Sequence, residues 1–257
     1  MSSANVTIGY NSAKAQELVK AITDTHPKIA ESMTSGWKTL SQTMQTQWVG
    51  ADESNAEATL ATHMCDLFAS CATAINGTVD GIAELNTDWV NFTNQNKISG
   101  TSGSASMNDH VFQATHVEEG SALISGTVKD PALTFSADQK IGLASESSGT
   151  EIGTALQSYV DTVGQEIQSL YSAIDSTQAF FGQQQEEKMA AYIQKVGEAL
   201  KKVIAYVEEI KTKLGEMAAK VATTATEAST AMDTAANNIN VTAGASNIGQ
   251  GPSAIQY

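Results

Sequence analysis

The sequence predicts a mainly α protein: an elongated helical bundle or coiled coil with a small β-containing or loop insertion. Two observations predict this fold class. Apolar residues recur at spacings of three and four over most of the chain, and only 6% of the residues are aromatic although 41% are hydrophobic. A core of aliphatic and alanine side chains suits packed helices. We divide the chain into four parts: 1–97, 98–150, 151–239 and 240–257.

The N-terminal part, residues 1–97, is expected to form a helical hairpin. Pro27 can open a helix but cannot lie inside one, so we expect a break or kink near His26. A second apolar stripe runs from Leu60 to Phe92. Two amphipathic helices joined by a short turn fold back antiparallel to bury both stripes. The first stripe consists of Ile29, Met33, Trp37, Leu40, Met44 and Trp48.

A short turn is predicted between the two stripes, at Trp48 and Gly50. Glycine accepts the left-handed backbone conformation that ends many helices. Asp52, Glu53 and Ser54 then offer carboxylates and a hydroxyl to the unpaired N–H groups at the start of the next helix. Trp48 is expected in the last turn of the first helix, where a large ring covers the open end of the hairpin.

This hairpin, with Trp-x-Gly at its turn, resembles the WXG family of small proteins that type VII secretion systems export. Trp48 and Gly50 match the motif, and Ala51 and Ala56 are small residues that follow it. The resemblance implies a non-enzymatic protein that is secreted or lies at the cell surface without a classical signal peptide. It also implies protein partners: the secretion machinery, a second copy or a helical co-substrate.

A possible export signal is present as well. Secreted WXG proteins often carry Tyr-x-x-x-Asp/Glu after a hairpin, and Tyr171 and Asp175 match these letters. They precede the second candidate turn of the chain instead of following it. The tail, 240–257, is polar and rich in glycine, which is typical of a segment without its own core.

Residues 98–150 differ in composition from the helical parts. The stretch "SGTSGSASMN" is typical of a flexible linker. The runs "HVFQATHV", "SALISGTV" and "PALTFSA" contain β-branched or aromatic residues between glycine, aspartate and proline, which favours a small antiparallel sheet or a loop. An insertion of this kind is a candidate recognition segment.

The C-terminal part, 151–239, carries the strongest periodic signal. A stripe from Val160 to Ile174 is followed by a longer heptad stripe whose phase continues to Ile239. A sustained period of this kind requires a partner helix along most of its length. We expect the following residues to form this coiled-coil seam: Met189, Ile193, Val196, Leu200, Val203, Val207, Ile210, Leu214, Met217 and Val221.

Two arrangements are open at Phe181 and Gly182, where the two stripes of the C-terminal part are out of phase. If the chain turns there, the aromatic-then-glycine order repeats that of Trp48 and Gly50, and two fused hairpins make one four-helix bundle. If the helix continues, the change of phase is a stutter of the kind that coiled coils tolerate. The continuous version is similar in layout to filament or tip subunits of type III secretion.

Charge and motifs exclude other functions. The formal net charge is -14 and the chain contains no arginine, which argues against nucleic acid. No apolar stretch approaches the ~20 residues of a transmembrane helix. Cys65 and Cys71 are expected to be free thiols, and His110 and His116 lack further ligands at metal-binding spacing. We therefore expect no enzyme, cofactor or metal, and an intracellular coiled-coil adaptor is the remaining alternative.

Overall fold

The computed structural model describes residues 11–96, 111–118, 124, 142–177 and 183–238. It confirms the predicted mainly α bundle. In chain order its elements are α1 (Ser12–Thr23), α2 (Thr25–Gln47), β1 (Trp48–Val49), α3 (Ala51–Gln95), β2 (Gly142–Leu143), α4 (Ser148–Asp175) and α5 (Gln183–Asn238).

α1 and α2 follow each other almost without interruption. Asn11 caps α1, because its side-chain oxygen accepts a hydrogen bond of 3.1 Å from the backbone N–H of Lys14. The break between the helices lies at Asp24, close to the predicted position near His26. Pro27 therefore lies in the first turn of α2, where backbone N–H groups have no intrahelical acceptor and none is lost.

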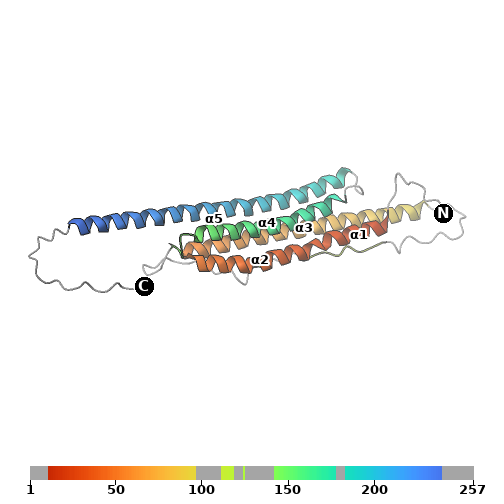
Figure 1. Cartoon of the computed structure of the whole chain (residues 1–257). Coiled ribbons are helices and arrows are strands. Elements are labelled where there is room, and N and C mark those ends of the chain that lie inside the picture. Colours follow the sequence, from red (N-terminus) through yellow and green to blue (C-terminus); the bar gives the residue numbers. More distant parts are fainter. Residues whose placement is uncertain (1–10, 97–110, 119–123, 125–141, 178–182, 239–257) are drawn as a thin grey trace, which may run out of the picture.

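α2, α3, α4 and α5 form an elongated four-helix bundle (Figure 1). α2 and α5 each pack against both α3 and α4. α4 and α5 run antiparallel: Tyr171 contacts Ile193 near one end of the pair, and Gln157 contacts Lys211 near the other. The chain thus turns back between α4 and α5. The two-hairpin arrangement is correct, and the unbroken helix of the second alternative is wrong.

Two glycines allow neighbouring helices to approach closely. Tyr159 of α4 lies across Gly36 of α2, and its hydroxyl donates to the carbonyl of Met33 at 3.0 Å. A Cβ on Gly36 would lie 2.6 Å from the Tyr159 ring. Between α3 and α5, a Cβ on Gly77 would lie 2.5 Å from the ring of Tyr192. Glycine inside a helix is unfavourable by backbone propensity alone, but at these two positions it makes room for tyrosine rings.

The connection between α3 and α4 contacts the first hairpin at two levels of the bundle, once at α3 and once at β1. The side chain of Asn76 accepts a 2.8 Å bond from the N–H of Val117 and donates a 3.0 Å bond to its carbonyl. Farther along the chain, β2 pairs with β1. Of the two alternatives for "HVFQATHV", a sheet or a loop, residues 111–118 adopt the loop. The asparagine amide takes the place of a partner strand there, so the backbone pairs with α3 instead.

α5 projects beyond one end of the bundle (Figure 1). Leu214 is 1% exposed, whereas every described side chain from residue 219 to residue 234 is exposed. We call residues 219–238 the α5 overhang. At ~1.5 Å per residue it is about 30 Å long.

Candidate functional site: the Trp48–Gly50 turn

The turn of the first hairpin lies between α2 and α3. α2 ends at Gln47, and Trp48 and Val49 continue in extended conformation and pair antiparallel with β2. Gly50 has a φ of 137° and a ψ of 176°, a conformation that residues with a Cβ rarely adopt. The backbone of this turn therefore requires glycine at position 50, which is the glycine of the Trp-x-Gly motif.

Two details of the predicted turn are wrong. Trp48 lies one residue beyond α2 instead of in its last turn, because it pairs with β2. Gly50 adopts an extended conformation with positive φ instead of the left-handed helical one. The N-cap of α3 is Gly50, which carries no side chain that could cap the helix. Glu53 and Ser54 are buried instead, and Ser54 Oγ donates to Glu53 at 3.1 Å. The side chain of Asp52 lies outside the described residues.

The ring of Trp48 is buried at the end of the bundle, with 4% of the residue exposed. Its Nε1–H is buried as well and has no hydrogen-bond partner among the described residues. Beside the ring lies an open cavity of about 290 Å³ between the start of α3 and α5, and Tyr206, Ile210 and Met217 are among the residues that line it. Trp48 thus packs at the point where α5 leaves the bundle.

Gln47 ties this turn to the second hairpin. Its backbone carbonyl accepts a hydrogen bond of 2.9 Å from the N–H of Ala144, and its side-chain oxygen accepts one of 2.6 Å from Ser148 Oγ. Ser148 is fully buried at the start of α4. The turn of the first hairpin and the beginning of the second are therefore one structural unit. Sequence reasoning missed this contact because no local pattern links Gln47 and Ser148.

A buried carboxylate joins α2 and α3 near the turn. Glu57 is 1% exposed. It accepts hydrogen bonds from Ser41 Oγ and, at 3.1 Å, from Gln45 Nε2. Burial of a carboxylate is expensive unless donors of this kind surround it. In the sequence, Glu57 lies between two alanines in a stretch of small residues, and this pattern by itself does not indicate a buried carboxylate.

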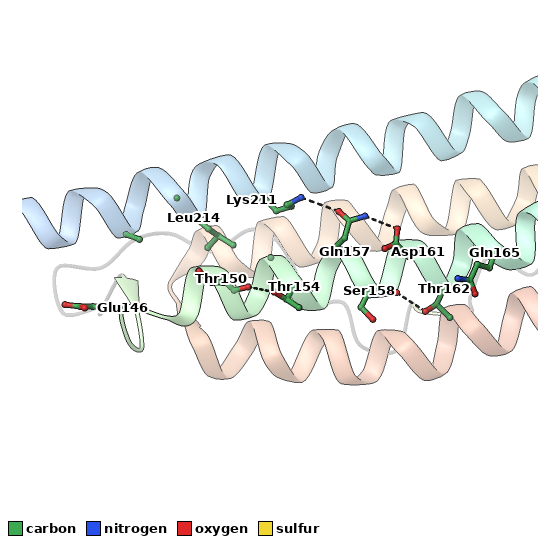
Figure 2. A pocket seen from close by; sticks show the side chains of 14 residues that line it. Glu146, Thr150, Thr154, Gln157, Ser158, Asp161, Thr162, Gln165, Lys211 and Leu214 are labelled. Atoms are coloured by element: carbon green, nitrogen blue, oxygen red, sulfur yellow. Dashed lines mark hydrogen bonds between the residues drawn. The ribbon is translucent and has the colours of Figure 1, made fainter.

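An open groove of about 790 Å³ runs along α4 and α5 (Figure 2). Across it, Lys211 Nζ donates to Gln157 Oε1 at 3.3 Å, and Gln157 Nε2 donates to Asp161 at 2.9 Å. The lysine is also paired with Glu208 at 2.7 Å. The charged lining residues are Glu146, Asp161 and Lys211, and the groove thus offers hydrogen-bond donors and acceptors. α4 contributes four hydroxyl groups at helical spacing: Thr150, Thr154, Ser158 and Thr162.

Most of the predicted seam faces the bundle interior. Ile193, Leu200 and Met217 are half-buried. Val221 is 49% exposed, so its prediction as a buried seam residue is wrong: α5 has left the bundle at this point and no described helix lies beside it. The buried members are Met189, Val196, Val203, Val207, Ile210 and Leu214.

The other predicted motif residues are only partly visible. Phe181 and Gly182 lie outside the described residues, so their role in the second turn stays a prediction. Tyr171 is half-buried, and its hydroxyl donates to the carbonyl of Ile193 at 3.5 Å. Asp175 is exposed as the last residue of α4. The candidate export signal therefore spans a side chain packed on α5 and one open to solvent.

Burial shifts the pKa values of both cysteines and of His26. Cys65 and Cys71 are free. Burial raises the pKa of the Cys71 thiol to about 12 and raises that of Cys65, so neither is a ready thiolate at neutral pH. Burial lowers the pKa of His26, whose Nε2 bonds to the carbonyl of Glu118 at 3.0 Å.

Three or more His, Cys, Asp or Glu residues do not cluster as a metal site anywhere in the described part of the chain. His116 instead pairs with Asp80 at 2.7 Å on the surface, and His110 lies outside the described residues.

Comparisons of the chain with protein-family models, curated proteins and solved structures found no match. Among the helices that the structure describes, none combines the length and apolar character needed to cross a membrane.

Proposed function

We propose that the chain is a non-enzymatic interaction protein of the WXG type, exported by a type VII-like system without a cleavable signal peptide. The observation that carries this proposal is the turn at Trp48 and Gly50. A helical hairpin reverses there through a glycine that the backbone requires, beside a buried tryptophan. These are the two residues that define the motif.

The second hairpin supports the same proposal. WXG proteins pair as hairpins from separate chains, and here α4 and α5 supply a second hairpin within one chain. Tyr159 and Gln47 connect the two hairpins through hydrogen bonds to Met33 and Ser148. The core is then complete within the chain, which leaves the outer surfaces for the secretion machinery and for partners outside the cell.

Two alternatives are less well supported. A filament or tip subunit would need one unbroken helix through Gly182. The antiparallel packing of α4 and α5 is incompatible with such a helix. An intracellular coiled-coil adaptor is compatible with the same bundle and differs from the proposal only in export.

Export is the decisive measurement. The full chain is expressed in a host that carries a type VII secretion system, with and without its membrane ATPase. We expect the chain in the medium or on the cell surface at its full 26.9 kDa, and only when the ATPase is present. Retention inside the cell in both strains would favour the adaptor.

A matched pair of variants tests the motif itself. Trp48→Phe and Trp37→Phe make the same chemical change, the first at the turn and the second within α2, at rings that are 4% and 2% exposed. We expect export to fall for Trp48→Phe alone, while circular dichroism shows both variants folded. Equal export of the two variants would remove the motif from the proposal.

A further inference from the structure

The apolar stripe of α5 does not stop where the bundle ends. Val207, Ile210 and Leu214 are buried against the other helices, and the stripe continues in phase through Val221, Ala225, Ala228 and Met232. On a helix with ~3.6 residues per turn, all of these lie within about 40° of one line along α5. Val221 is 49% exposed and Met232 74%. The surface that α5 uses inside the bundle thus extends, unpaired in the described structure, along the overhang.

The opposite face of the overhang is polar. Its threonine hydroxyls donate to backbone carbonyls four residues earlier, as from Thr226 to Ala222 at 3.0 Å and from Thr230 to Thr226 at 2.9 Å. Threonine is a weaker helix former than alanine, and helices in water gain most of their stability from packing an amphipathic face. An overhang with one apolar and one threonine face is therefore suited to packing on one side. The threonines of the polar face are Thr223, Thr226, Thr230 and Thr234.

We propose that this face binds the overhang of a second copy of the chain in antiparallel orientation. The order of side chains on the stripe is self-complementary. An alignment centred between residues 226 and 227 places Val221 opposite Met232 and Ala225 opposite Ala228, and the two-fold symmetry repeats each pair. The larger side chains then meet at the two ends, and the central alanine layers let the helices approach closely.

Charge supports this occupant and this orientation. Residues 219–238 contain three charged side chains, Lys220, Glu227 and Asp233, and none lies on the stripe. A face without charge suits a second uncharged stripe better than a basic or acidic partner. The formal net charge of each chain is -14. Antiparallel pairing holds the two acidic bundles at opposite ends of the paired helices, whereas parallel pairing would place them side by side, where they repel each other.

The first test is the mass of the full chain in solution, measured by sedimentation over a range of concentrations. We expect a reversible dimer of about twice 26.9 kDa. Met232→Asp places a charge on the stripe and is expected to abolish the dimer. Thr230→Asp places the same charge on the opposite face and should leave it intact. A monomer at all concentrations overturns the proposal. The stripe would then be covered by another occupant, such as the tail or a different protein.

The second test distinguishes the orientation. Spin labels are attached to a cysteine at position 226 or at position 234, after replacement of Cys65 and Cys71. In the antiparallel pair, residue 226 lies beside residue 227 of the other copy, whereas residue 234 lies beside residue 219 of the other copy. The label at 234 of one copy is then separated along the helix axis from the label at 234 of the other copy by fifteen residues, or about 22 Å at ~1.5 Å per residue. The two labels at 226 are separated along the axis by one residue only. We expect a clearly longer distance at 234 than at 226. Equal distances at the two positions would overturn the antiparallel pairing. This proposal does not depend on export, because both measurements use the purified chain.

Discussion

One helix of this protein carries the same apolar stripe through two different environments. Between Met189 and Leu214, α5 packs its stripe into the four-helix bundle, and Val207 there is 2% exposed. In the overhang the stripe continues in phase, yet Val221 is 49% exposed. A heptad pattern therefore shows which face a helix can bury, while the lengths of the neighbouring helices decide how much of that face is buried within the chain.

The largest expected effect contrasts these two valines. Val207→Asp buries an unpaired charge between helices, and we expect the free energy of unfolding to fall by about 4 kcal/mol. Val221→Asp in the monomeric chain should change it by less than about 0.5 kcal/mol, as at other exposed positions. Urea unfolding followed by circular dichroism, at a concentration where the chain is monomeric, measures both. Equal losses would mean that the overhang is buried within a single chain.

Trp48 lies at the boundary between the two environments. Trp48→Ala removes a buried ring at the end of the bundle, and we expect a loss of about 3 kcal/mol in the free energy of unfolding. Trp48→Phe should lose less than about 1.5 kcal/mol, since the indole N–H has no hydrogen-bond partner among the described residues. The same urea unfolding measures both variants. If Trp48→Ala were as mild as Trp48→Phe, the ring would not hold the end of the bundle together.

Two glycines give a third and weaker contrast. Gly36→Ala presses a Cβ against the ring of Tyr159, which is buried and held by its hydrogen bond to Met33, so we expect a loss of about 2 kcal/mol. Gly215 directly follows Leu214, and a Cβ there meets nothing within 4 Å. Gly215→Ala should therefore stabilise the chain by about 1 kcal/mol. Because both changes favour a helix equally, thermal unfolding that gave the same sign for both would contradict the packing difference between the two sites.

The sequence predicted much of the candidate site, because the motif and the turn are local. Gly50 at the end of one apolar stripe was enough to locate the reversal of the chain, and Trp48 beside it indicated a buried ring. The buried Glu57 and the contact from Gln47 to Ser148 were not predictable in this way. Their partners come from other helices, and a single sequence contains no pattern that pairs residues across such distances.

The sequence by itself determined where the helices lie and which face of each one is apolar, since spacings of three and four residues follow from the geometry of the helix backbone. It left open whether the chain turns after α4, and it predicted Val221 as part of a buried seam. Only the tertiary structure decided these two points. Whether a stripe is buried depends on where the partner helices begin and end in space. α3 and α4 provide partners for α5 only as far as Met217, so the stripe beyond it stays exposed.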